Sequence, residues 1–319
     1  MRVLVTGGAG FIGSVTVAAL LERGHHVTVY DNLSTGYRRA VHPDARLVDG
    51  ELHDFKSLWE ATEGVEGVVH FAGLIAVAES VEQPAHYYQV NVGGTQVLLD
   101  AVADHGNLQT LVFSSSAAVY GEPLFTPIVE SSERNPVNPY GETKLLAERL
   151  IEAYADRFDF RWVGLRYFNA AGATPALGEA HNPEAHLLPN VVDAALGRKG
   201  LTINGFDYQT PDGTCVRDYV HVLDLAQAHV LALEKPVAGA FNVGGGRGYS
   251  NLEVVRAVEG AVGREVPFVR GQRRPGDPAV LVASVEKSRS ELGWQPARDL
   301  AAMARDALAW RESHPSGYD

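Results

Sequence analysis

The stretch that decides the fold is Arg2-Val-Leu-Val-Thr-Gly-Gly-Ala-Gly-Phe-Ile-Gly13. Its apolar start predicts a buried strand, and the residues from Phe11 to Arg23 have the apolar spacing of a helix. Gly7, Gly10 and Gly13 lie between the two, where glycines allow a tight turn and let the backbone approach a pyrophosphate at the helix N-terminus. The alternative reading is a glycine-rich turn that binds nothing.

An aspartate supports the first reading. Asp31 ends the second predicted strand, 18 residues after Gly13, where a carboxylate accepts from the adenosine ribose hydroxyls of a dinucleotide. A carboxylate at this point repels a 2′-phosphate, so the sequence predicts NAD as the cofactor.

The same alternation of strand and helix continues through the first half of the chain. This order predicts a parallel sheet with helices on both faces, wound by right-handed crossovers into a doubly wound Rossmann domain. Predicted strands are 2–5, 26–30, 46–48, 67–71, 108–114 and 161–166, and the predicted helices after 11–23 are 55–61, 84–104 and 138–157.

The sequence changes character after Asn169. Residues 170–190 are rich in proline and have no long periodic run, and shorter elements follow them. We therefore expect an NAD-binding domain over residues 1–169 and a smaller α/β substrate domain over residues 170–319. Residues 216–233 are a candidate segment for returning to the first sheet.

Composition excludes several classes of protein. The chain has 319 residues, 45% of them hydrophobic and 21% charged, with a net charge of -12. Such an acidic chain lacks the basic face that duplex nucleic acid requires. Cys215 is the single cysteine, so an internal disulfide is impossible and a reducing cytoplasm is the expected location. Neither a signal peptide nor an apolar run long enough to cross a membrane is evident.

Tyr140 and Lys144, in Tyr140-Gly-Glu-Thr-Lys144, are the candidate catalytic pair. Their spacing places both side chains on one helical face, where a lysine ammonium favours phenolate and lowers the pKa of the tyrosine. This predicts a general base near neutral pH, as against a half-buried tyrosine beside a solvated lysine. Ser114-Ser-Ser116 follows the fifth predicted strand, so at least one hydroxyl is expected to face the cofactor.

Together these residues resemble the extended short-chain dehydrogenase/reductases, and within them the enzymes that epimerise UDP-sugars at C4. The resemblance runs from residue 1 to about residue 312. The stretches that carry it are TGGAGFIGS, DNLSTG, HFAGL, AVAESVEQP, NVGGT, FSSSAAVYGE, PYGETK, LRYFNAAGA, DGTCVRDYVHVLDLA, FNVGGG and RRPGD.

The resemblance implies a role for each matching residue. Tyr140 is the expected base, Lys144 tunes it and binds the nicotinamide ribose, and Ser116 contacts the sugar O4. Further residues that match cofactor positions are Gly7, Gly10, Phe11, Ile12, Gly13, Asp31, Asn32, Ser34, Thr35, Gly36, Glu51, Leu52, Phe71, Ala72, Gly73, Leu74, Asn91, Ser114 and Phe168. Those that match positions for the nucleotide sugar are Asn169, Leu187, Asn204, Arg217, Arg274, Asp277 and Leu281. For Arg217 and Asp218, a local surface ion pair is the alternative.

The implied activity is reversible C4 epimerisation of UDP-galactose and UDP-glucose through a 4-keto intermediate, with tightly bound NAD. The alternatives are another epimerase, including one for UDP-N-acetylhexosamines, or a dehydratase or decarboxylase of the same family. Dehydratases need an acid–base pair where this chain has Ala117 and Ala118, which cannot transfer protons. Leu281 leaves the acceptance of N-acetylated sugars open.

Two further expectations concern assembly and metal. By resemblance, helices 84–104 and 138–157 form the interface of a homodimer. His181 and His186, in His181-Asn-Pro-Glu-Ala-His186, could be metal ligands, but no further ligand cluster is evident beside them. The sequence therefore favours a loop without metal.

Overall fold

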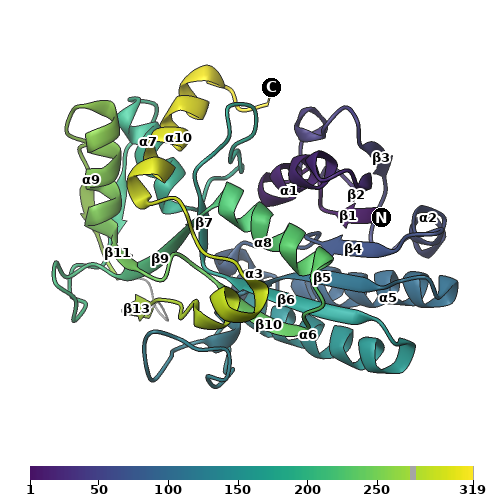
Figure 1. Ribbon diagram of the computed structural model, residues 1–319. Coiled ribbons are helices and arrows are strands. Elements are labelled where there is room, and N and C mark those ends of the chain that lie inside the picture. Colours follow the sequence, from purple (N-terminus) through teal and green to yellow (C-terminus); the bar gives the residue numbers. More distant parts are fainter. Residues whose placement is uncertain (274–277, 319) are drawn as a thin grey trace.

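A seven-stranded parallel sheet forms the centre of the protein. The computed structural model describes residues 1–273 and 278–318, and the order of the strands in this sheet is β10-β6-β5-β4-β1-β2-β3 (Figure 1). The strand order reverses direction between β1 and β4, and at such a point a doubly wound sheet opens a crevice at its carboxyl edge. The predicted fold class is confirmed. The strands are β1 (Arg2–Thr6), β2 (His26–Asp31), β3 (Arg46–Asp49), β4 (Gly67–His70), β5 (Thr110–Ser116), β6 (Arg161–Tyr167) and β10 (Gly239–Val243).

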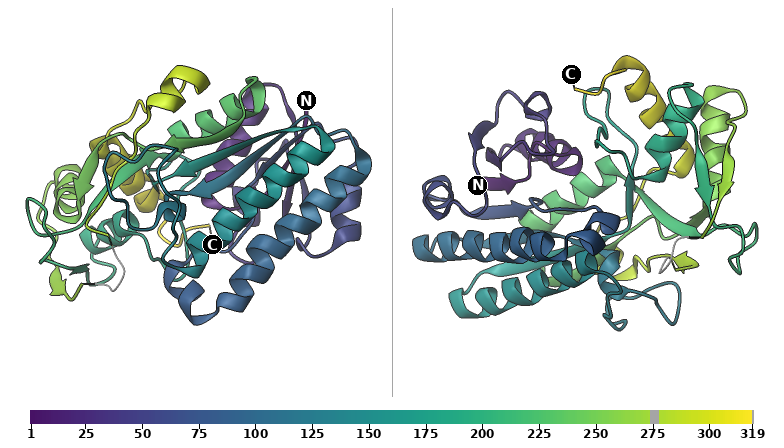
Figure 2. Two further views of the ribbon diagram at one scale, coloured as in Figure 1. Left: turned by 90° about the horizontal axis from the view of Figure 1, so that it is seen from below. Right: turned by 180° about the vertical axis from the view of Figure 1, so that it is seen from behind.

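Helices cover both faces of this sheet because its strands are apolar on both faces. Val3 and Val5 of β1 pack with α1 and α8, whereas Leu4 packs on the opposite face with α2, α5 and α6. Figure 2 shows α5 and α6 side by side along one face. These helices are α1 (Phe11–Glu22), α2 (Phe55–Ala61), α5 (Gly94–His105), α6 (Pro139–Phe158) and α8 (Val222–Glu234).

The helix expected over residues 84–104 is interrupted, so that prediction is wrong in its continuity. The segment consists of α4 (Pro84–Tyr87), the π-helical segment η2 (Tyr88–Gly93) and α5. Asn91 lies in η2, and its side chain bonds both the backbone N–H and the carbonyl of Leu74 at 2.8 and 3.0 Å. A widened turn of this kind is frequent at functional sites, and no propensity pattern indicates it.

A second, smaller group of elements follows β6. Strand β9 pairs with β7, β11 and β13, and β8 pairs with β12. Helices α7, α9 and α10 pack together beside these strands (Figure 1). The bounds are β7 (Asn169–Ala171), β8 (Thr202–Asn204), β9 (Val216–His221), β11 (Gly248–Ser250), β12 (Val269–Gly271), β13 (Val280–Leu281), α7 (Leu187–Ala195), α9 (Asn251–Val262) and α10 (Leu300–Ser313). The remaining short helices are η1 (Arg38–Ala40), α3 (Val77–Glu82), η3 (Ala117–Tyr120) and the π-helical η4 (Ser288–Leu292).

The chain returns to the first sheet after β9. Strand β9 itself pairs within the smaller sheet, whereas α8 packs against α1 and β10 pairs with β6 at the edge of the large sheet. The returning segment therefore comprises α8 and β10. The division into domains at residues 169 and 170 remains a prediction.

Within residues 1–273 and 278–318, no helix combines the length and the apolar character that crossing a membrane requires.

Candidate active site

The glycine turn after β1 has no space for side chains. A Cβ at Gly13 would lie 2.2 Å from the carbonyl oxygen of Gly7, and a Cβ at Gly7, whose φ is +71°, would lie 2.6 Å from the backbone nitrogen of Ala72. Helix α1 begins directly after Gly10, which has no side chain to cap the first N–H groups. This turn therefore fits the pyrophosphate of NAD, because uncapped N–H groups at a helix N-terminus attract an anion.

Asp31 lies at the carboxyl end of β2, next to this turn. Its side-chain oxygens accept from the backbone nitrogens of Ala9 and Leu33, each at 2.9 Å. Burial raises the pKa of Asp31 above its ordinary value. Beyond it, Asn32 donates to the carboxylate of Glu51 at 3.0 Å, so these two predicted cofactor residues are brought together.

The other predicted cofactor residues line the same edge of the sheet. A Cβ built at Gly36 would lie 2.9 Å from Ala9, so these two residues are in close contact. The backbone N–H and the hydroxyl of Ser34 both donate to the side-chain oxygen of Asn32. Leu52 and Phe168 are buried beneath this edge. Asn91 holds the backbone of Leu74 in place, and the segment from Phe71 to Leu74 therefore has a fixed course beside the glycine turn.

Tyr140 and Lys144 come from the first turns of α6, which begins at Pro139 and is capped by Asn138. Lys144 is 3% exposed, and its Nζ donates to the carbonyl oxygen of Ser114 at 2.9 Å. The same Nζ lies 5.9 Å from the centre of the Tyr140 ring. Ser116, at the end of β5, lies near enough to Tyr140 that its hydroxyl favours the phenolate. The structure thus brings together all three predicted catalytic residues.

The electrostatics of this group differ from the sequence-based expectation. Burial raises the pKa of Tyr140, and the nearby hydroxyl of Ser116 opposes this rise only in part. Burial also lowers the pKa of Lys144 to about 8. The lysine ammonium faces a peptide carbonyl rather than the phenol oxygen, so the expected lowering of the tyrosine pKa needs a further positive charge at the site.

The three serines lie inside β5 rather than after it, which corrects the predicted strand end. Since side chains alternate along a strand, Ser114 and Ser116 share one face and Ser115 lies on the other. Ser115 donates to Glu148 at 2.5 Å, and Glu148 forms a buried ion pair with Arg166. Ser115 is therefore part of the framework beneath the site.

The predicted substrate residues gather on neighbouring strands of the smaller sheet. Arg217 of β9 is the register partner of Leu281 in β13, and Asn169 of β7 pairs with Tyr219 of β9. Arg217 is 8% exposed and Asp218 is fully buried, so the alternative of a surface ion pair is wrong. Asp218 instead accepts from the backbone nitrogens of Gly245, Gly246 and Ala283.

Two other predicted substrate residues do not lie on the strands that pair with β9. Leu187 is the first residue of α7, and Asn204 ends β8. Arg274 and Asp277 lie outside the described residues.

Sequence reasoning missed one buried histidine at the cofactor edge. His70 ends β4, between the hydroxyls of Thr6 at 2.6 Å and Thr95 at 2.9 Å. Burial, together with the charge of Lys144, lowers the pKa of His70 to about 3. Its position at the carboxyl end of a predicted strand was the one available signal.

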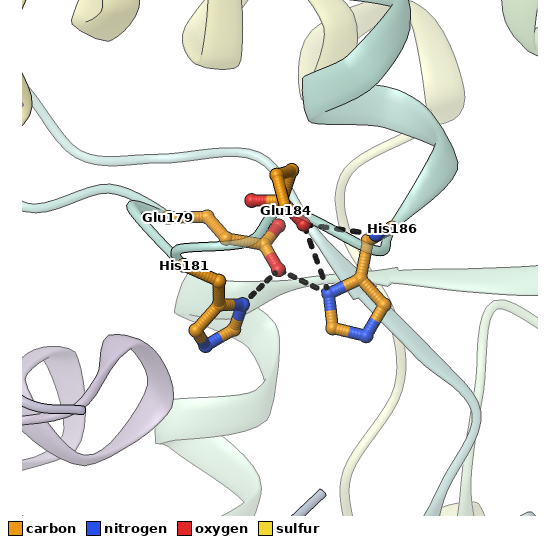
Figure 3. A group of neighbouring side chains, drawn as sticks. All are labelled: Glu179, His181, Glu184 and His186. Atoms are coloured by element: carbon orange, nitrogen blue, oxygen red, sulfur yellow. Dashed lines mark hydrogen bonds and ion pairs between the residues drawn. The ribbon is translucent and has the colours of Figure 1, made fainter. Parts of the chain in front are cut away.

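Sequence reasoning also missed a group of four side chains before α7. The expectation of no further ligands near His181 and His186 is wrong, because Glu179 and Glu184 join them (Figure 3). The spacing Glu-x-His-x-x-Glu-x-His is visible in the sequence, but the prediction rested on the histidines alone.

A parallel sheet with a glycine turn, an acidic residue ending β2 and a half-buried tyrosine beside a buried lysine defines an NAD-binding enzyme that acts on a hydroxyl group. Comparison with known proteins specifies the family. Residues 3–244 match the model of the NAD dependent epimerase/dehydratase family, and the chain belongs to this family. The predicted resemblance and the NAD cofactor are thereby confirmed.

Individual relatives agree over the whole chain. The chain is 50% identical to the UDP-glucose 4-epimerase of Corynebacterium glutamicum over 97% of its own length and 95% of the relative's. The crystal structure of UDP-glucose 4-epimerase from Brucella ovis in complex with NAD has a TM-score of 0.92, with 48% identity over 96% of this chain and 97% of that one. That of the Bifidobacterium longum enzyme in complex with NAD+ and UDP has a TM-score of 0.94, with 39% identity over 99% and 100%. These likenesses confirm the predicted enzyme class, an NAD-dependent epimerase.

Proposed function

We propose that the chain interconverts UDP-galactose and UDP-glucose by reversible epimerisation at C4 of the sugar, through a 4-keto intermediate. The observation that carries this proposal is the convergence of Tyr140, Lys144 and Ser116 at the carboxyl edge of the large sheet. The identity of nearly half of all residues to UDP-glucose 4-epimerases, over the full chain, supports the same substrate.

In this reaction, Tyr140, Lys144 and Arg217 have separate roles: proton transfer, positioning of the cofactor and binding of the nucleotide. Tyr140 accepts the proton of the C4 hydroxyl, directly or through Ser116, and later returns it. Lys144 is fixed by the carbonyl of Ser114 and orients the nicotinamide ribose. NAD bound at this edge would supply a hydride acceptor and donor for C4, and its positively charged nicotinamide would favour the phenolate of Tyr140. Arg217 binds the diphosphate and so holds the nucleotide while the sugar turns.

The two residues after Ser116 bear on whether the 4-keto sugar can lose water. Ala117 and Ala118 lie in η3, directly after Ser116 at the end of β5. Because methyl groups cannot transfer protons, the keto intermediate meets no acid–base pair at these positions that would eliminate water. Return of the hydride is the remaining course, and it gives the epimer or the starting sugar.

The test is an assay with purified protein, UDP-galactose and no added NAD. We expect UDP-glucose to form, and Tyr140→Phe to keep its bound NAD while turnover falls about 100- to 10,000-fold. Tyr154→Phe is the matched control, because Tyr154 lies on the same helix and bonds Asp100 instead. Protein that carries NAD but converts neither UDP-galactose nor UDP-N-acetylgalactosamine would contradict the proposal, and conversion of the second substrate would show that Leu281 admits an N-acetyl group.

We further propose that the protein acts in the cytoplasm as a homodimer joined through α5 and α6. Leu146 and Leu150 of α6 are only partly buried, and Tyr88 of η2, a segment that packs against α6, is 39% exposed, so these elements retain apolar surface for a second copy to cover. Light scattering should give twice the mass of the chain, and Leu150→Arg should give the mass of one chain. A monomeric wild type would contradict this assembly.

A further inference from the structure

We propose that Glu179, His181, Glu184 and His186 bind one divalent transition-metal ion of the zinc class. The four side chains each offer one ligand atom, and these atoms all lie within 4.8 Å of one another. Figure 3 shows them facing a common centre from a single loop that leads into α7. None of the four belongs to the catalytic group of Tyr140, Lys144 and Ser116, and His186 directly precedes Leu187, a predicted substrate residue.

The ligand atoms are close enough together to reach a tetrahedral arrangement around one ion. Nδ1 of His181 lies 3.1 Å from Oε1 of Glu179, and Nδ1 of His186 lies 3.7 Å from Oε1 of Glu184. The Nδ1 of His186 also contacts the same Oε1 of Glu179. Zinc at about 2.0–2.2 Å from each of four ligands places neighbouring ligand atoms about 3.4 Å apart. A cation therefore fits between these atoms after small movements of the side chains.

The ligand types select the kind of metal. Two imidazoles with two carboxylates suit zinc and its neighbours in the first transition series, whereas magnesium and calcium prefer oxygen ligands alone. Two negative charges are brought together at Glu179 and Glu184, which is costly in a largely buried place unless cations offset it. In the chain without metal, protonated His186 supplies part of this charge, since the carboxylate of Glu179 raises the pKa of His186 to about 9. A purely ionic cluster is thus the competing explanation.

The surroundings favour a bound ion in two ways. Glu179, His181 and Glu184 line a cavity of about 310 Å³ between this loop, α7 and the chain end, which offers a route of entry. The loop is also held at its start, because the hydroxyl of Tyr37 donates to the carbonyl of Ala180 at 2.7 Å. His186 is the N-cap residue of α7, so a metal here would fix the start of this helix.

The test uses the untagged full-length chain, stripped with a chelator and then incubated with zinc chloride. After gel filtration, we expect the wild type to retain about one zinc per chain, as one four-ligand site requires. The double variant His181→Asn/His186→Asn should retain none. Cobalt chloride in place of zinc should give the visible absorption of tetrahedral cobalt in the wild type alone. Zinc should also raise the melting temperature of the wild type, since it binds only the folded chain.

Two further variants keep the result interpretable. His42→Ala removes a histidine that lies 3.8 Å from Asp44 elsewhere on the surface, and it should leave zinc retention unchanged. Glu179→Gln keeps the shape of the site and should lose the metal even if the double variant fails to fold, with bound NAD as the check on folding. Equal zinc retention by the wild type and both site variants, or none by any protein, would overturn the site and leave the ionic cluster as the explanation.

Discussion

The cofactor side of the candidate active site is made from the ends of neighbouring parallel strands, whereas the substrate side is made from short strands far apart in the chain. On the first side, the glycine turn, Asp31 and Ser116 all follow from where β1, β2 and β5 end. On the second side, Arg217 and Leu281 meet only because β9 pairs with β13. Both sides depend on long-range pairing, but on the first side each residue is marked by a local signal, the end of its own strand, whereas on the second side only the pairing of the short strands brings the residues together.

The two sides also differ in which atoms define them. Around Gly7 and Gly13 the backbone itself fills the space, so an added methyl group has nowhere to go. Around Arg217 a side chain supplies the predicted contact, so its replacement leaves the backbone in place. We therefore expect changes on the cofactor side to abolish function and changes on the substrate side to adjust it.

The largest effect is expected from Gly13→Ala. Its Cβ would lie 2.2 Å from the carbonyl oxygen of Gly7, a clash that must open the turn that faces the pyrophosphate. Bound NAD, measured by absorbance after denaturing the purified protein, should fall below a tenth of the wild-type amount, because each 1.4 kcal/mol is about tenfold in affinity. Turnover should fall with it.

Gly260→Ala is the matched control for this change. Gly260 lies inside α9, and a Cβ there has no neighbour within 4 Å. The variant should keep its NAD and gain about 0.5–1 kcal/mol in the free energy of unfolding, because glycine is a poor helix former. Equal NAD content in both variants would show that the close packing at Gly13 does not matter for cofactor binding, and the proposed difference between the two regions would be wrong.

This contrast explains how much could be predicted from the sequence. Strand ends, glycines and the Tyr140–Lys144 spacing are local signals, so the fold class and most of the cofactor edge were predictable. The pairing of β10 with β6 depends on residues more than 70 positions apart, and no local pattern encodes it. The interruption of the helix at Asn91 likewise arises from a tertiary contact with Leu74.

The next effect is narrower, because Arg217→Met on the substrate side should weaken substrate binding alone. Loss of a charge-assisted hydrogen bond costs about 1.5–3 kcal/mol, so the KM for UDP-galactose should rise about 10- to 150-fold. Bound NAD should stay at the wild-type amount, because Arg217 belongs to the smaller sheet. Steady-state kinetics and NAD content measure the two quantities separately.

Arg289→Met serves as the control for removing a positive charge, because Arg289 forms an exposed pair with Glu286 at 3.0 Å. Its KM should stay unchanged. Loss of NAD from Arg217→Met would show that the two sides are coupled more tightly than their construction suggests.

The smallest effect concerns acid stability, and here burial acts on the two regions with opposite sign. Burial lowers the pKa of His70 to about 3 at the cofactor edge and raises the pKa of Asp218 to about 7 on the substrate side. Stability from neutral His70 is present above its unfolded pKa of 6.5 and is lost as the pH falls toward 3. Stability from protonated Asp218 is present below its unfolded pKa of 3.8 and is lost as the pH rises through 7.

Urea unfolding between pH 4.5 and 6 separates these contributions. The hydroxyl of Thr95 donates to the carbonyl of Asn91, so it must accept from Nε2–H of His70. Nδ1 of the neutral imidazole then accepts from the hydroxyl of Thr6, a bond that protonation would remove. His70→Gln should therefore reduce the gain of unfolding free energy with pH by about 1.4 kcal/mol per pH unit, and Asp218→Asn should increase it by about the same amount. His26→Gln, at an exposed position of β2, is the control and should leave the change of unfolding free energy with pH as in the wild type. Equal slopes in all four proteins would mean that neither group is buried in the charge state that its surroundings impose.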